Sequence, residues 1–145
     1  MIKVKIINKS NNPIPEYATA GSAGFDLRAH LENEVSIEPG GRGMISTGIS
    51  IQLPVGYEAQ IRPRSGLALK NGITVLNSPG TVDSDFSGIC QVILHNTSTE
   101  YFKISNGDRI AQMVIAKYEK VEFESVEVLE ETERGSKGFG STGTN

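Results

Sequence analysis

The segments Ile49–Leu53 (ISIQL) and Tyr57–Ile61 (YEAQI) point to the fold, because both are short and carry apolar residues at alternate positions. Segments of this kind, rich in β-branched residues, favour strands. Others recur along the chain, at Met1–Ile7, Ile73–Leu76, Ile89–His95, Tyr101–Ile104 and the alternating Val121–Glu124. Pairs typical of turns lie between them, at Pro39-Gly40, Asn71-Gly72 and Asn106-Gly107. The pattern predicts an all-β fold, an antiparallel sandwich, barrel or jelly roll.

One segment departs from the strand pattern. Ser65 could cap a short helix through Leu67–Lys70, which would end at Asn71-Gly72. The C-terminal residues 134–145 are rich in Gly, Ser and Thr, and by composition alone they are typical of a mobile tail. We therefore expect a single β domain, residues 1–133, followed by a flexible segment, residues 134–145.

Composition narrows the class of protein. The 145 residues are 37% hydrophobic and only 6% aromatic, with no Trp, as expected for a soluble globular protein whose core is built from Ile, Val and Leu. The net charge of -3 and the mixed signs argue against a nucleic-acid-binding surface. Cys90 is the only cysteine, so an intrachain disulfide is excluded. The N-terminus has neither a signal peptide nor a membrane span, so we expect no membrane association and a cytoplasmic location.

Common catalytic motifs are absent from the sequence. His30 and His95 lie far apart and beside no other ligand in metal-binding spacing, which argues against a zinc hydrolase. The tail has Gly140-Ser141-Thr142 but lacks the lysine of a phosphate-binding Walker loop. No Gly-x-Ser-x-Gly elbow is present.

Two segments could carry phosphate chemistry. Pro63–Ala68 places Arg64 and Ser65 at the expected helix start, where free N–H groups attract anions, although an ordinary serine cap has the same pattern. Gly80–Gly88 holds Asp83 and Asp85, and a carboxylate there could activate water beside a polyphosphate. Read alone, that segment is also typical of a plain loop.

Three further segments are weak signals individually. In Gly107–Gln112, Asp108 could pair with an arginine and Gln112 could donate to a phosphate. In Ala23–Ala29, Asp26 enters a strand, an arrangement that is more often structural. The tail, residues 134–143, combines cations, hydroxyls, glycines and Phe139, and could fold over a triphosphate while the ring stacks on a base.

Taken together and in this order, the five segments resemble the five motifs of the trimeric dUTPase family, over Ala23 to Gly143. The resemblance implies a distorted jelly-roll-like β barrel or sandwich (β-clip) with one short helix. It also implies a homotrimer whose three active sites are each assembled from all three subunits. The implied reaction is Mg²⁺-dependent hydrolysis of dUTP to dUMP and diphosphate, which limits uracil in DNA and supplies dUMP.

The resemblance also assigns roles. Asp83 matches the carboxylate that directs water at the α-phosphorus. Asp26 and Asp108 match supporting positions that hold arginines and waters. Mg²⁺ would bind through the phosphates and water, without direct protein ligands. The positions that match phosphate contacts are Arg64, Ser65, Gly66 and Gln112, with Arg134, Ser141 and Thr142 on the closing tail.

Base and sugar selection follow from the same resemblance. Asn77 and the backbone of Gly80, Thr81 and Val82 match the hairpin that reads the uracil edge and excludes a C5 methyl group. Phe86 matches the residue that packs on deoxyribose and leaves no room for a 2′-hydroxyl. Phe139 of another subunit would stack on uracil.

Two positions depart from the family pattern. Position 86 is usually Tyr, so Phe86 keeps the ring and loses the hydroxyl. Lys137 stands where the family more often has Gly, which adds a cation to the tail and removes some backbone freedom.

Two other functions compete with hydrolysis. The related dCTP deaminases share the fold and an Arg-Ser element, but Gly66-Leu67-Ala68 and the segments around Asp83 and Phe139 favour the hydrolase. The second alternative is an interaction protein in which closure of the tail over dUTP controls binding to another protein, although no insertion stands out as a docking surface.

Overall fold

The computed structural model describes residues 1–138 and has an all-β architecture with one short helix in that part of the chain. The helix, α1, is Ser65–Asn71. The strands are β1 (Lys5–Asn8), β2 (Gly24–Arg28), β3 (Val35–Ile37), β4 (Arg42–Ser46), β5 (Ile49–Gln52), β6 (Tyr57–Arg62), β7 (Ile73–Val75), β8 (Gly80–Val82), β9 (Gln91–Asn96), β10 (Phe102–Ile104) and β11 (Arg109–Lys117).

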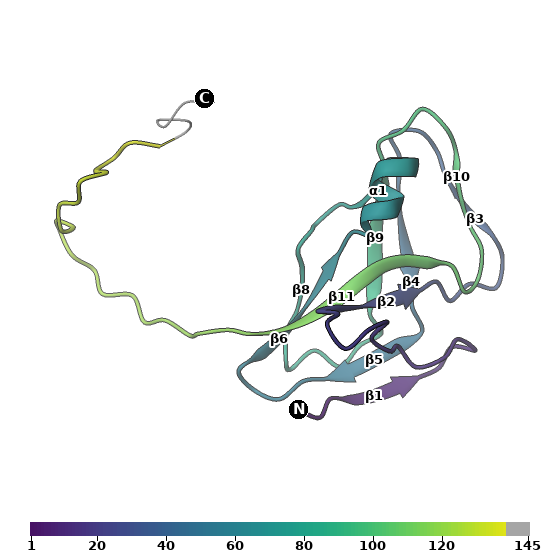
Figure 1. Ribbon diagram of the computed structural model, residues 1–145, viewed down its shortest axis with the longest axis horizontal. Coiled ribbons are helices and arrows are strands. Elements are labelled where there is room, and N and C mark those ends of the chain that lie inside the picture. The colour runs from purple at the N-terminus through teal and green to yellow at the C-terminus, as the bar shows by residue number, and fades with distance from the viewer. Residues whose placement is uncertain (139–145) are drawn as a thin grey trace.

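Within residues 1–138 the strands form four antiparallel sheets (Figure 1). The largest has the order β2-β11-β6-β8, and its long strand β11 is paired on both sides. A second sheet has the order β4-β9-β7, and the remaining strands pair as β1-β5 and β3-β10. Most neighbours in these sheets are distant in sequence, so tertiary pairing sets the positions of the loops that carry the predicted site.

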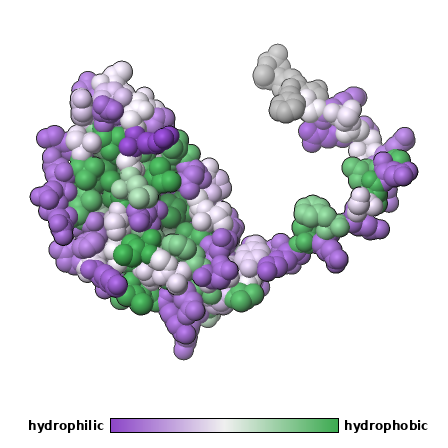
Figure 2. Space-filling model, turned by 180° about the vertical axis from the view of Figure 1, so that it is seen from behind, coloured by the Kyte–Doolittle hydropathy of each residue, from purple (hydrophilic) through white to green (hydrophobic). Residues whose placement is uncertain are grey.

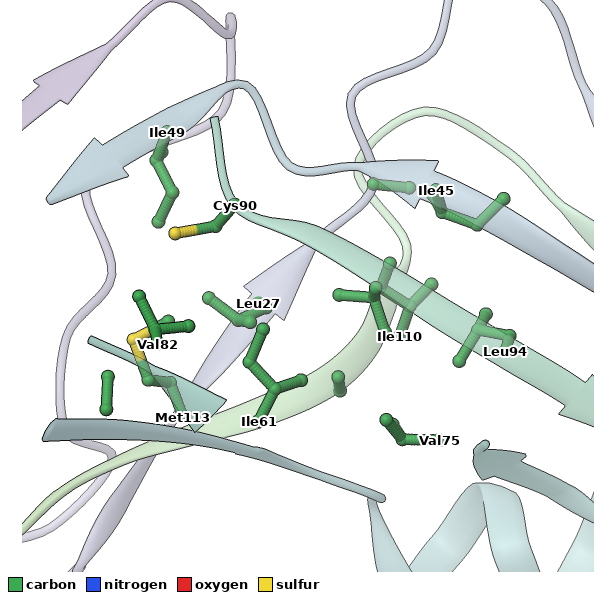
Figure 3. Close-up of a cluster of buried hydrophobic side chains, with 14 of the residues drawn as sticks. Leu27, Ile45, Ile49, Ile61, Val75, Val82, Cys90, Leu94, Ile110 and Met113 are labelled. Carbon is green, nitrogen blue, oxygen red and sulfur yellow. The ribbon is translucent and has the colours of Figure 1, made fainter. Parts of the chain in front are cut away.

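A core of aliphatic side chains lies between the sheets. Leu27, Leu94 and Met113, from three different strands, have no exposed surface. Figure 3 shows Cys90 pointing into the same interior as Ile49, Leu27 and Val82. Burial of branched aliphatic side chains contributes about 1.5–3 kcal/mol each. The core therefore fixes the strands from which the site loops emerge.

Most predicted strands are confirmed to within a few residues. The first is shorter than Met1–Ile7 at its N-terminal end, and β9 begins after Ile89 and Cys90. The glycines of the three predicted turns, Gly40, Gly72 and Gly107, all have positive φ, the conformation that glycine adopts without strain.

The helix is confirmed, but the predicted serine cap is wrong. Arg64 occupies the N-cap position with extended backbone and makes no side-chain capping hydrogen bond, and Ser65 is the first helical residue. Gly72 ends the helix in the left-handed region, and its N–H donates to the carbonyl of Ala68. Ser65 is consequently left with an exposed side chain at the start of α1.

The predicted strand Val121–Glu124 is also wrong for the single chain. Residues 119–138, which we call the C-terminal arm, contain no strand and are exposed throughout. Phe123 is 93% exposed. Figure 1 shows the arm leaving the β body at the end of β11, and Figure 2 shows apolar and polar residues following one another along it. The alternation produces no strand because no partner edge lies beside it.

In residues 1–138 no helix combines the length and the apolar character required to span a bilayer.

Candidate active site

A cavity of about 290 Å³, the hairpin cavity, lies beside the connection from β7 to β8 and the loop that follows. Its lining includes six residues predicted to act on the nucleotide: Asn77, Gly80, Thr81, Val82, Asp83 and Phe86. Strand β8 is anchored by the β6–β8 ladder, in which Gly80 pairs with Ile61 and Val82 with Ala59. Strand β7 pairs with β9 in another sheet, so β7 and β8 are joined by a turn but do not form the predicted two-stranded hairpin. The structure thus brings together the predicted base, sugar and catalytic residues.

The turn between β7 and β8 is tightly closed. The N–H of Ser78 donates to the carbonyl of Val75 at 3.1 Å, and the Ser78–Pro79 peptide bond is cis. A Cβ atom on Gly80 would lie 3.1 Å from Nδ2 of Asn77, so the side-chain amide of Asn77 rests against the Gly80 backbone. A hydrogen-bonding amide therefore stands beside a backbone edge in β8, an arrangement that suits recognition of a planar base.

Asp83 and Phe86 form the next turn. The N–H of Phe86 donates to the carbonyl of Asp83 at 3.2 Å. Both side chains are exposed at the cavity, with Phe86 at 45%. Below them Cys90 is buried, and desolvation raises the pKa of its thiol above the ordinary value, so it stays a neutral part of the wall.

A second group of polar residues, which we call the arginine cluster, comprises Asp26, Arg64 and Arg109. Asp26 in β2 accepts a hydrogen bond from Nε of Arg64 at 2.8 Å, and Nη1 of Arg109 lies 3.5 Å from its other oxygen. The three side chains are 27–54% exposed. One carboxylate between two guanidinium groups leaves a net positive charge, which suits an anion.

Gln112 ties this cluster to the start of α1. It lies opposite Asp26 in the β2–β11 ladder, and its Nε2 donates to the carbonyl of Pro63 at 2.9 Å. A Cβ atom on Gly24 would come within 2.8 Å of Oε1 of Gln112, so the glycine leaves the space that the amide occupies. The predicted phosphate donor is therefore engaged with the residue that precedes Arg64.

The remaining predicted residues have varied outcomes. Ser65 and Gly66 are exposed at the start of α1. Asp108 accepts a hydrogen bond from the N–H of Ser105 at 2.8 Å and closes a turn. Within residues 1–138 it makes no ion pair with an arginine, so the predicted pairing of Asp108 with an arginine is wrong for the single chain. The exposed Arg134 donates to the carbonyl of Lys137 at 3.0 Å within the arm. Phe139, Ser141 and Thr142 lie outside the described residues.

Comparison with known proteins identifies the family. The dUTPase family model matches residues 3–143. The chain belongs to the dUTPase family. A deoxyuridine 5'-triphosphate nucleotidohydrolase of Finegoldia magna is 57% identical over 98% of this chain and 99% of that protein. One from Anaplasma marginale is 53% identical over 99% and 100%.

Solved structures agree with this assignment. The dUTPase of Staphylococcus bacteriophage 80alpha, solved with dUPNHPP, has a TM-score of 0.88 and 25% identity. The match covers 99% of this chain and 100% of that one. The family resemblance inferred from the five sequence segments is confirmed, and so is the all-β class.

Two residues of this dUTPase fold matter at the site although the sequence alone does not single them out. Arg109 shares Asp26 with Arg64, and Gly24 makes room for Gln112. Both lie within quoted motif segments, but their contacts depend on the register between β2 and β11, in which Arg109 faces Arg28 and Val114 faces Gly24. No pattern in one strand alone gives that register.

The hairpin cavity and the arginine cluster are separate in the single chain. Within residues 1–138 none of the four predicted phosphate contacts, Arg64, Ser65, Gly66 and Gln112, lines the hairpin cavity. The same part of the chain has no group of three or more His, Cys, Asp or Glu arranged to hold a metal ion.

Proposed function

We propose that this chain hydrolyses dUTP to dUMP and diphosphate. The observation that carries the proposal is the hairpin cavity, which gathers Asn77, Asp83 and Phe86 at one place. The curated relatives that match nearly the whole chain are named for this activity. Through this reaction the enzyme limits uracil incorporation into DNA and supplies dUMP.

Asp83 is the general base in this proposal. Its carboxylate is exposed at the hairpin cavity, where a water can reach it. The carboxylate accepts a proton from that water and directs the water oxygen at the α-phosphorus, on the side opposite the departing diphosphate. A bond forms between the water oxygen and the α-phosphorus while the bond from the α-phosphorus to the oxygen bridging to the β-phosphorus breaks; that oxygen leaves with the diphosphate, and dUMP remains.

The phosphates are held by cations and N–H donors. Arg64, Ser65 and Gly66 meet at the start of α1, and Asp26 orients the guanidinium of Arg64. Charge that develops on the leaving diphosphate is stabilised by such pre-positioned donors. Gln112 either turns from Pro63 to the phosphate or fixes the Pro63 carbonyl behind Arg64. Arg134, Ser141 and Thr142 close on the β- and γ-phosphates as part of a lid, residues 134–145, that follows the domain of residues 1–133.

The active site is shared between the subunits of a homotrimer with a jelly-roll-like fold. The separation of the hairpin cavity from the arginine cluster supports this arrangement, because a single chain does not bring base and phosphate contacts into one pocket. The extended arm supports it too, since it runs away from the β body of its own chain (Figure 1). Each site then combines one subunit's hairpin cavity, a second subunit's arginine cluster and a third subunit's lid.

The hairpin cavity selects the nucleotide. Asn77 and the backbone of Gly80, Thr81 and Val82 bind the uracil edge, whose donor and acceptor pattern differs from that of cytosine. Phe86 packs on the deoxyribose, and Phe139 stacks on the base. A site built for particular hydrogen bonds rejects an analogue that leaves its polar groups unpaired.

Mg²⁺ fits this arrangement as a partner of the substrate. It retains water readily and binds phosphate oxygens, so it enters with the triphosphate and neutralises charge on it. The protein contributes the arginines and amides around that complex and no direct ligand. We place the reaction in the cytoplasm, with no nucleic-acid or membrane partner.

The test is diphosphate release with Mg²⁺ from dUTP, dCTP, dTTP and UTP. We expect turnover of dUTP alone, and a loss of about 10²–10⁴-fold in Asp83→Asn. Asp85→Asn is the matched control, since Asp85 is exposed nearby and does not line the cavity. Equal turnover of all four nucleotides, or full activity in Asp83→Asn, contradicts the proposal; ammonia release from dCTP would favour a deaminase.

A further inference from the structure

Gly88 lies directly against the ring of Phe86. A Cβ atom built on Gly88 would stand 2.7 Å from Cζ of that ring and 3.0 Å from Cε2. Carbon atoms do not approach so closely without displacement, since optimal separation is about 3.5–4.0 Å. The ring therefore occupies space that any other residue at position 88 would fill.

The requirement for glycine at this position comes from space and not from the backbone. Six glycines in residues 1–138 have positive φ, at positions 40, 48, 56, 72, 107 and 135, and Gly88 is not among them. An alanine could adopt the backbone conformation of residue 88. The three atoms nearest to its methyl group, chain neighbours aside, would all lie at the far end of the Phe86 side chain.

The ring has few other restraints. Phe86 is 45% exposed, so part of its surface faces solvent. Its backbone N–H is held to Asp83, but a phenyl ring has no hydrogen-bonding group with which to fix its own orientation. Contact with its neighbours, Gly88 among them, sets where the ring lies.

Phe86 and Ile89 line the hairpin cavity, whereas Gly88 does not. We therefore expect Gly88 to influence a bound nucleotide through a neighbour, and the three atoms nearest to a Cβ atom built at position 88 all belong to the ring of Phe86.

We propose that Gly88 is a specificity-determining residue for the sugar: by seating the Phe86 ring, it sets the space open to a 2′-substituent. This inference rests on the proposed role of Phe86 against deoxyribose. A methyl group at position 88 moves the end of the ring, and the wall that excludes a 2′-hydroxyl moves with it. Gly88 is thus a positioning residue, and its effect appears in sugar discrimination more than in folding.

The experiment measures kcat/KM for dUTP and for UTP in wild type, Gly88→Ala, Phe86→Ala and the double variant. We expect Gly88→Ala to lower the dUTP/UTP ratio about tenfold or more, a size typical of steric discrimination between close analogues. We expect Phe86→Ala to lower it at least as much, and the double variant to match Phe86→Ala. Gly21→Ala is the control, because a Cβ atom there meets nothing within 4 Å, and its ratio should equal that of wild type.

The outcomes separate two failures. An unchanged ratio in Phe86→Ala would refute the sugar role of Phe86 itself. A lowered ratio in Phe86→Ala with no change in Gly88→Ala would overturn the role of Gly88 alone. If Gly88→Ala lowers the ratio equally with and without the ring, Gly88 acts by another route and the inference fails. If Gly88→Ala folds poorly, removal of the ring in the double variant must restore its melting temperature; a failure to do so also overturns the inference.

Discussion

The β body and the C-terminal arm both contain segments in which apolar and polar residues alternate, but only the segment in the body forms a strand. In β9, apolar Val92 and Leu94 alternate with partly exposed Ile93 and His95, and the strand is paired on both edges. In the arm, Val121 and Phe123 alternate with glutamates, yet both are exposed at 71% and 93%. Alternation therefore supplies a strand-forming pattern, but a strand forms only where an edge accepts its hydrogen bonds.

We also expect the two regions to have separate roles: the body provides stability, and the arm carries the predicted lid. We expect the body to be stable without the arm, because the last backbone hydrogen bond to the body within residues 1–138 is made by Tyr118, whose N–H donates to the carbonyl of Gly56. The arm carries the predicted lid without contributing to the core. Three changes test this division, from the largest expected effect to the smallest.

The first change removes the lid by ending the chain after Glu133. We expect dUTP hydrolysis to fall by about a hundredfold or more, because the substrate phosphates lose their closing contacts. The unfolding free energy should change by less than about 0.5 kcal/mol, since residues 134–138, the described part of the removed segment, are exposed. Diphosphate release and thermal melting measure the two quantities. A chain ending after Gly143 is the control, and full activity without the lid would contradict the division.

The second change compares one leucine from each region. Leu94→Ala should cost about 2–5 kcal/mol of unfolding free energy, because Leu94 is fully buried. Leu129→Ala should cost less than about 0.5 kcal/mol within a single chain, because Leu129 is 81% exposed. Chemical denaturation at several protein concentrations measures both. A larger, concentration-dependent loss in Leu129→Ala would mean that the arm is buried against another subunit.

The third change compares thiols. Cys90 should react with iodoacetamide at pH 8 at least about tenfold more slowly than a thiol introduced by Ser125→Cys, because it is buried and its pKa is raised. Since folding raises this pKa, the associated stability is present at pH values below the ordinary pKa of a thiol and is lost as the pH rises through the folded value. Labelling followed by mass spectrometry gives both rates. Equal rates would show that the wall beneath the hairpin cavity opens readily.

Much of the fold could be predicted from single segments. Strands with several β-branched residues, such as β5 and β7, and turns with glycine were found by pattern alone. Short strands that contain glycine, β4 and β8, carry too little local signal, and Val35–Ile37 has only three residues. They are strands because β9, β6 and β10 pair with them, and pairing is a tertiary property.

The candidate site divides in the same way. The residue types and their order in the five segments were sufficient to identify the family, and the residues of the hairpin cavity were predicted together. Which carboxylate binds which arginine was not predictable: Asp26 pairs with Arg64, while Asp108 closes a turn. Those contacts depend on the approach of strands that are far apart in the chain, and neighbouring residues do not encode it.

The attachment of the arm to β11 has a mechanical consequence. A pull on the C-terminus is transmitted to a strand with hydrogen-bonded neighbours on both sides, β2 and β6. Such a load runs along the strand and strains many hydrogen bonds of both ladders at once, whereas a load across an edge strand would break them one after another. A force applied through the arm along β11 should therefore leave the register of this sheet unchanged until both ladders fail together.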